Sequence, residues 1–315
     1  MWRVIIPLLL MFSLVGCAIS SPPASQVNDT FSPTTAPTDS VSPQAPTSTN
    51  SPIIATQPLD TVVPTSTDEL ELWQTLPVIP TISPEMAEVY RRGQERGRDP
   101  QHFSKIGDCQ NITTYYLAMF DSGSYSLGDQ YAYLQPTIDY FKDSWWRESL
   151  AVKGGMNVAA VQNVLWANPE KCKKGETPLA CEIRVHNPAF AIISLEESWT
   201  GSIERYDYYM RVIVDYVIAQ DVVPIIATRA ETLTQDRRIN PIVAQIALDY
   251  NLPLWNFGAA AAALPDNGMR PDGFHLTEGR SYFDDPELLS TGWAQRNLTA
   301  LQTLDSVLRG MVILP

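Results

Sequence analysis

Residues 188–227 read PAFAIISLEESWTGSIERYDYYMRVIVDYVIAQDVVPIIA. This stretch opens with an apolar run, Ala189 to Leu195, and closes with a second one, Val222 to Ala227. Uninterrupted apolar runs of this length are typical of strands buried on both faces of a parallel sheet. Between them, apolar residues recur at helical spacing from Ser202 to Gln220, which predicts one amphipathic helix. The stretch is therefore predicted to be a strand–helix–strand unit, the building block of an α/β fold.

The same alternation continues on both sides of this unit. Further strands are expected at Phe103 to Ile106, Leu150 to Val152 and Pro253 to Phe257. Further helices are expected from Pro84 with Ser83 as its cap, over Val158 to Leu165, over Pro241 to Tyr250, and over Trp293 to Leu308 with Gly310 as its C-cap. About five strands in this order predict a three-layer α/β/α sandwich with a flavodoxin-like, mostly parallel sheet.

The first residues have the composition of a targeting signal. Arg3 precedes an apolar run from Val4 to Val15, which is shorter than the ~20 residues that span a bilayer as a helix. The run ends in Leu14-Val15-Gly16-Cys17, which resembles the lipobox of bacterial lipoproteins, where the cysteine is lipidated after cleavage. Residues 1–17 are therefore expected to be a lipoprotein signal peptide, and the mature chain an extracytoplasmic protein anchored to the cell membrane by lipid on Cys17. An uncleaved N-terminal anchor is the alternative.

Composition divides the rest of the chain into two parts. Residues 18–80 are rich in Ser, Thr and Pro, so they are expected to form a disordered tether, because they cannot bury enough apolar surface to offset their chain entropy. Residues 81–315 have the composition of one globular domain. The net charge of −13 argues against a nucleic-acid partner, which requires a basic surface.

The chain has four cysteines, Cys17, Cys109, Cys172 and Cys181. Cys172 and Cys181 flank a short loop rich in turn formers and are predicted to form a disulfide in an oxidising compartment. With Cys17 lipidated, Cys109 is left outside the predicted disulfide and is a candidate reactive thiol.

Two short segments carry side chains suited to catalysis. Gly107-Asp108-Cys109 directly follows the first expected strand, and Asp272-Gly273-Phe274-His275 lies near the C-terminus. A thiolate at the start of a helical turn is favoured by the partial positive charge there. A carboxylate that accepts a hydrogen bond from one ring nitrogen of a histidine fixes the tautomer, so that the other nitrogen can act as a base.

In order and position, these segments resemble the first and last sequence blocks of the SGNH/GDSL hydrolases, with Cys109 where that family has its nucleophilic serine. The resemblance implies Cys109 as nucleophile, His275 as base and Asp272 as the residue that orients His275. It implies Gly155 as an oxyanion donor after the second strand, with Gly154 as the alternative. It places Ser198 where the family has an asparagine donor, so that Glu196-Glu197-Ser198 replaces Gly-x-Asn.

The resemblance implies an extracytoplasmic hydrolase of O-acyl esters, of the esterase, lipase or acetyl-esterase type, acting on a small-molecule or polysaccharide ester. No cofactor and no metal site are expected. The alternative is a catalytically weak or inactive relative that binds a surface glycan or another envelope component, because both Cys109 and the Glu196–Ser198 segment depart from the family pattern. A redox role for Cys109 is less favoured because no resolving cysteine is near it in the sequence.

Ordinary structural roles are also open to the candidate residues. Cys109 can be a small buried core residue, and Asp272 with His275 can be only a hydrogen-bonded loop pair. Gly155 can be a turn glycine, and Ser198 can be a helix cap. His102 and His186 have no comparable neighbours in the sequence and are interpreted as structural or surface groups.

Overall fold

The computed structural model describes residues 72–195, 199–231 and 237–313. The signal segment with Cys17, most of the tether, and Glu196 to Ser198 lie outside the described residues. Trp73 is already packed against the domain, at 2% exposure, and its carbonyl accepts a hydrogen bond from Asn256 Nδ2 at 2.7 Å. The folded domain therefore begins before residue 81, where composition placed its boundary.

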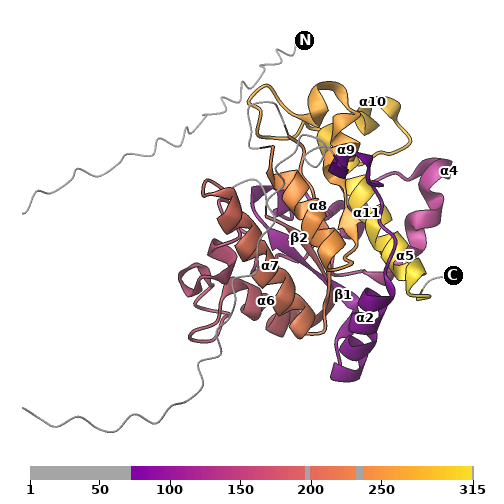
Figure 1. Cartoon of the computed structure of the whole chain (residues 1–315). Helices are drawn as coiled ribbons and strands as arrows, with labels where there is room; N and C mark the ends of the chain where they lie inside the picture. Colours follow the sequence, from indigo (N-terminus) through magenta and orange to yellow (C-terminus); the bar gives the residue numbers. More distant parts are fainter. Residues whose placement is uncertain (1–71, 196–198, 232–236, 314–315) are drawn as a thin grey trace, which may run out of the picture. The chain divides into compact units, whose positions relative to one another are not determined.

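Four parallel strands form the sheet, in the order β1 (Asp99–Gly107), β2 (Pro188–Ser194), β3 (Val223–Ala227) and β4 (Leu254–Trp255) (Figure 1). β2 and β3 are buried along their whole length, as the two apolar runs predicted. In the register of the sheet, Gly107 lies opposite Ser194, and Ile193 lies opposite Ile226. The predicted strand–helix–strand unit and the α/β fold class are confirmed.

The predicted strand at residues 150–152 is reduced to a single parallel bridge, between Val152 and Gly107. The reason is local, because Ala151 N donates to Ser149 Oγ and Val152 N donates to the Ser149 carbonyl, so a turn uses the donors that a ladder would need. The bridge lies on the edge of β1 opposite β2. Counted with it, the order along the sheet is 2-1-3-4-5, the flavodoxin-like order, although only four strands are formed.

Helices cover both faces of the sheet. They are α2 (Pro84–Arg96), α3 (Met119–Ser122), α4 (Gly128–Tyr131), α5 (Gln135–Tyr140), α6 (Pro178–His186), α7 (Ile203–Ala219), α8 (Ile239–Asp249), α9 (Phe257–Ala262), α10 (Pro286–Leu289) and α11 (Gly292–Gly310). The helices α7 and α8 lie on one face, where they pack on β3 and on each other. The chain from β1 to Val152 moves to the edge of β1 away from β2, whereas the later connections move toward β3 and β4. It places α5 on the opposite face, against α11. Across the described residues, none of the helices has both the length and the apolar character needed to cross a bilayer.

Two expected helical features differ in the structure. Residues 158–165 form no α-helix but two 3-10 turns, Ala160–Gln162 and Val164–Trp166. The side chain of Asn163 accepts a hydrogen bond from Leu165 N and interrupts the helical path between the turns. The sequence predicted Gly310 as the C-cap of the last helix. In the structure, Gly310 is the last residue of α11 and Met311 is its C-cap. The cap of α2 is Ser83, as predicted, and the cap of α7 is Ser202, the first residue of the stretch predicted to be helical.

Candidate active site

Cys109 begins a single 3-10 turn, Cys109–Asn111, directly after β1. Asp108 caps this turn, because its Oδ1 accepts a hydrogen bond from Gln110 N at 3.1 Å. Cys109 is half-buried and is not part of a disulfide. The sequence led us to expect that partial positive charge at the start of a helix favours the thiolate of Cys109. A turn of three residues has only a small dipole, so this stabilisation comes only from the N–H groups of one turn.

Long-range contacts fix this turn in the sheet. Asn111 is fully buried and its Nδ2 donates to the carbonyl of Ser194, the last residue of β2, at 2.9 Å. The Asn111 side chain lies directly over Gly107, where any Cβ would collide with its amide. Glycine is therefore required at the end of β1 for the turn that carries Cys109 to close against β2.

The Asp272–His275 loop is organised by one carboxylate. Asp272 Oδ1 accepts hydrogen bonds from the backbone N–H groups of Phe274 and His275, each at 2.9 Å, and Oδ2 lies 3.0 Å from His275 Nδ1. The backbone N–H groups of His275 and Phe274, and then the imidazole, hold the pKa of Asp272 well below its usual range. With Nδ1–H donating to the carboxylate, Nε2 is the nitrogen able to accept a proton. The side chains of Asp272 and His275 are 45% and 59% exposed, so the imidazole is open to solvent.

The structure brings these two segments together. Gln110, the residue after Cys109, donates from Nε2 to the carbonyl of Phe274, the residue before His275, at 3.3 Å. Gln110 is buried at 3% exposure and Phe274 is partly exposed, so this contact is partly shielded from solvent. The thiol segment and the imidazole segment are therefore neighbours at the carboxyl ends of the strands, where open α/β sheets bind their ligands.

Gly155 lies close to the same place. Lys153 N donates to the carbonyl of Gly107 at 3.4 Å, which holds the following Gly154-Gly155 segment beside the end of β1. Met156 N closes a turn onto the Lys153 carbonyl, with Gly155 at φ 76°, a conformation that favours glycine. Both glycines are exposed, and neither backbone amide donates to another described residue. Either amide is thus available to a ligand at this edge of the sheet. Ser198, the other expected donor, lies outside the described residues.

A buried carboxylate that sequence reasoning did not identify supports this side of the site. Glu182 of α6 is fully buried and accepts hydrogen bonds from Arg147 Nη1 and Nη2 at 2.6 and 2.8 Å, and from Leu150 N at 2.9 Å. Burial raises the pKa of Glu182, but the bonds from Arg147, Ser104 and Leu150 outweigh it, and the net pKa is lowered. Glu182 therefore anchors residues 147–150, which lead into the Val152 bridge and the glycine turn.

A buried arginine that was also not anticipated lies at the end of β2. Arg296 of α11 is 1% exposed, and its Nη2 donates to Ser194 Oγ at 2.7 Å. Its guanidinium lies about 5 Å from three ring centroids, those of Tyr116, Trp255 and Phe257. None of the described carboxylates forms an ion pair with it. A positive charge thus lies behind the β2 end to which the Cys109 turn is bonded, where it favours negative charge that develops nearby.

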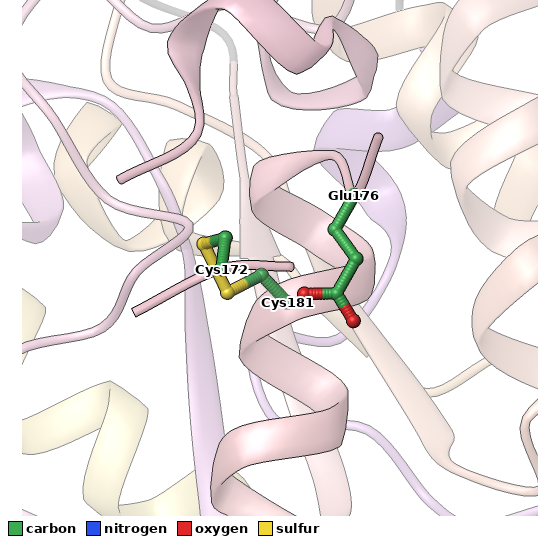
Figure 2. Close-up of side chains that lie close together, drawn as sticks. All are labelled: Cys172, Glu176 and Cys181. Carbon is green, nitrogen blue, oxygen red and sulfur yellow. A yellow bond between two sulfur atoms is a disulfide. The ribbon is translucent and has the colours of Figure 1, made fainter. Parts of the chain in front are cut away.

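The predicted disulfide between Cys172 and Cys181 is present. With Glu176 these cysteines form the one group of potential metal ligands found among the described residues (Figure 2). Their sulfur atoms are bonded to each other, and Glu176 is held by Arg184, which lowers its pKa to about 2. These donors are already engaged in structural contacts, so the group closes a loop.

The other two histidines have structural contacts. His186 is 7% exposed and its Nε2 lies 3.1 Å from the Phe103 carbonyl, while its ring stacks on His102 at 4.3 Å. Burial lowers the pKa of His186 to about 4, which keeps it neutral. His275 is the histidine placed beside the Cys109 turn.

No protein-family model and no curated protein matches the chain. Among solved structures, the chain is similar to the psychrotrophic esterase EstA from Pseudoalteromonas sp., with 13% identity and a TM-score of 0.41, over 65% of this chain and 96% of that one. It is similar to a GDSL-like lipase from Bacteroides thetaiotaomicron, with 11% identity and a TM-score of 0.40, over 70% and 98% of the two chains. It is also similar to a two-domain esterase active on acetylated mannans, with 13% identity and a TM-score of 0.40, over 72% and 54%.

Proposed function

We propose that this chain is a hydrolase of O-acyl esters that uses Cys109 as nucleophile, His275 as general base and Asp272 to orient His275. The observation that carries the proposal is the hydrogen bond from Gln110 to the Phe274 carbonyl, because it joins the segment of the thiol to the segment of the imidazole. The contact between Asp272 Oδ2 and His275 Nδ1 supports the role of His275, since it leaves Nε2 to act as the base.

In the proposed reaction, His275 Nε2 takes the thiol proton as the sulfur of Cys109 attacks the ester carbonyl carbon. The C=O π electrons move to the oxygen and form a tetrahedral oxyanion. Collapse of this intermediate breaks the bond to the alkoxy oxygen, which leaves as the alcohol with the proton from His275. A water molecule then gives a proton to His275 and attacks the thioester, which releases the carboxylic acid and restores the thiol.

The oxyanion requires donors fixed in advance. We propose the backbone N–H of Cys109 and that of Gly155 or Gly154 for this role. Gly155 is positioned by the bond between Lys153 N and the Gly107 carbonyl, and by the turn that Met156 closes. Ser198 is proposed as a third donor on the basis of its place in the sequence after β2. The buried charge of Arg296 adds to the positive potential at this edge.

The N-terminal sequence supports a proposed location. We propose that Cys17 carries lipid and that the domain acts outside the cytoplasm, held near the membrane by the tether. The disulfide between Cys172 and Cys181 agrees with an oxidising compartment.

The test is turnover of a short-chain aryl acetate by the purified protein and three variants. Cys109→Ala and His275→Ala should each lose at least about a thousandfold in kcat/KM, while His102→Ala, a matched histidine outside the site, should stay within about twofold. Full activity in Cys109→Ala would remove the thiol from the mechanism. If the folded wild-type protein turns over neither aryl acetates nor glycan acetates, the hydrolase proposal is wrong and a binding function replaces it.

A further inference from the structure

A groove of about 930 Å³ is lined partly by residues that follow each of the two proposed catalytic segments in the chain. One wall contains Thr114 and Tyr115, shortly after the Cys109 turn, and the other contains Glu278 to Tyr282, shortly after His275. Its size lies within the range of natural ligand sites. The proposed reaction uses none of its residues.

Two aromatic rings form a stacked pair in this groove. The rings of Tyr115 and Trp293 lie 5.7 Å apart with an interplanar angle of 26°, and Tyr115 remains 58% exposed. Tyr115 is positioned by its N–H, which donates to the Ile112 carbonyl, and by its own carbonyl, which accepts from Asn297 Nδ2 at 3.2 Å. An aromatic pair that is held by the backbone yet open to solvent offers a ring face to a ligand.

The same pair is tied to both catalytic segments. Tyr115 belongs to the segment that leaves the Cys109 turn. Trp293 N donates to the carbonyl of Thr277, two residues after His275, at 3.1 Å, and Gly292 N donates to Thr277 Oγ1 at 2.7 Å. A ligand that stacks on this pair is therefore held at a fixed position relative to both the thiol and the imidazole.

The rest of the lining identifies the class of ligand. Met119 and Leu288 are the only aliphatic side chains of this groove among the described residues. The remaining side chains are aromatic, or are hydroxyl, amide and charged groups, with the Arg280 guanidinium 6.0 Å from the ring of Tyr282. A fatty acyl chain requires an enclosure of aliphatic surface, which this groove does not provide. A pyranose ring presents C–H groups to an aromatic face and hydroxyls to polar side chains.

We infer that this groove binds the carbohydrate part of an O-acylated glycan, with Tyr115 and Trp293 as the stacking surface for a sugar ring. The role of the bound glycan as substrate rests on the proposed esterase function. The binding itself does not, because no residue of the groove takes part in the proposed chemistry.

The experiment measures binding without turnover. Cys109→Ala protein is run in native gels that contain acetylated mannan, acetylated xylan or the deacetylated polymers, and the dissociation constant of the best polymer is then obtained by calorimetry on its oligosaccharides. Adding Tyr115→Ala or Trp293→Ala should weaken binding about tenfold or more, and Trp293→Phe should restore most of it. Tyr208→Ala is the matched control, because Tyr208 is 61% exposed and lies beside the ring of Tyr209 at 5.4 Å. It should bind as Cys109→Ala alone does.

The inference is overturned if none of the four polymers retards the protein, or if the groove variants bind like the control. It is also overturned if micellar laurate competes for the groove and the glycans do not. If Trp293→Ala does not fold, Tyr115→Ala carries the test, since that side chain is exposed. Groove-dependent binding by a wild-type protein with no esterase activity would support this inference while removing the proposed function. Turnover of aryl acetate with no glycan binding would support the proposed function and overturn this inference.

Discussion

Two carboxylates organise the two sides of the candidate site, and they do so in opposite environments. Glu182 is fully buried and Asp272 is 45% exposed. Each accepts backbone N–H hydrogen bonds and binds one nitrogen-bearing side chain, Arg147 for Glu182 and His275 for Asp272, and each has a lowered pKa. The chemistry of the two groups is alike, but the partners of Asp272 lie within three residues of it, and those of Glu182 lie more than thirty residues away in the chain.

Because Asp272 is exposed and Glu182 is buried, we expect Asp272 to affect the proposed catalysis and Glu182 to affect the stability of the fold. Hydrogen bonds around an exposed carboxylate are screened by water and contribute little to folding, so the effect of Asp272 is on the orientation and tautomer of one imidazole. A buried carboxylate that loses its charge leaves its cation without a partner in a low-dielectric interior, and that loss weakens the whole fold. The two sites should therefore respond differently to the same substitution of an amide for a carboxylate.

The largest effect is expected for Asp272→Asn on turnover. The amide can donate to Nδ1, which favours the tautomer whose Nε2 already carries a proton, and kcat should fall by roughly 10²–10⁴ while the unfolding midpoint changes little. Steady-state kinetics and urea titration of the same preparation measure both quantities. A variant with full turnover would show that Asp272 only shapes its loop.

Glu182→Gln should have the opposite effect to Asp272→Asn, with a larger change in stability than in turnover. We expect the free energy of unfolding to fall by about 3 kcal/mol at neutral pH, because Arg147 loses its buried counter-charge. The folded pKa of Glu182 is lowered, so its contribution is present above about pH 4.3, the value in an unfolded chain, and is lost as the pH falls further. The gap between wild type and variant in urea denaturation should therefore narrow below that pH. A gap that is constant from pH 7 to pH 3 would contradict the assignment.

Gly107→Ala should have a smaller effect, and it tests how rigidly the turn that carries Cys109 is held. The added methyl group meets the buried amide of Asn111, and overpacking of this kind costs about 2 kcal/mol. Gly154→Ala is the control, because a Cβ there meets nothing within 4 Å, and it should change stability by less than about 0.5 kcal/mol. Equal stabilities for the two variants in thermal unfolding would show that the turn relaxes around the extra carbon.

The contrast between the two carboxylates also explains what the sequence could predict. The Asp272–His275 pair is a local pattern that spacing alone indicates, and the disulfide and the cap at Ser83 were predictable for the same reason. The strand–helix–strand unit was predictable because its apolar runs are long and uninterrupted.

The features that the sequence did not predict depend on contacts distant in the chain or on competing local bonds. Nothing in the sequence marks Arg296 as buried, because an arginine in a helix usually faces solvent. Residues 158–165 have helical spacing, but Asn163 bonds to its own backbone neighbourhood and breaks the helix. The strand expected at 150–152 was lost to a turn at Ser149 in the same way.

Gly107 is bonded on both sides, to the Val152 segment on one edge and opposite Ser194 of β2 on the other. Insertions or deletions cannot enter there without breaking the sheet, whereas the exposed side chains of Thr114, Tyr115, Glu278 and Arg280 on the walls of the groove have no such restriction. Evolution or engineering can therefore replace those walls while the centre stays unchanged. The molecule divides into a part that must be inherited intact and a part that is free to vary with each new ligand.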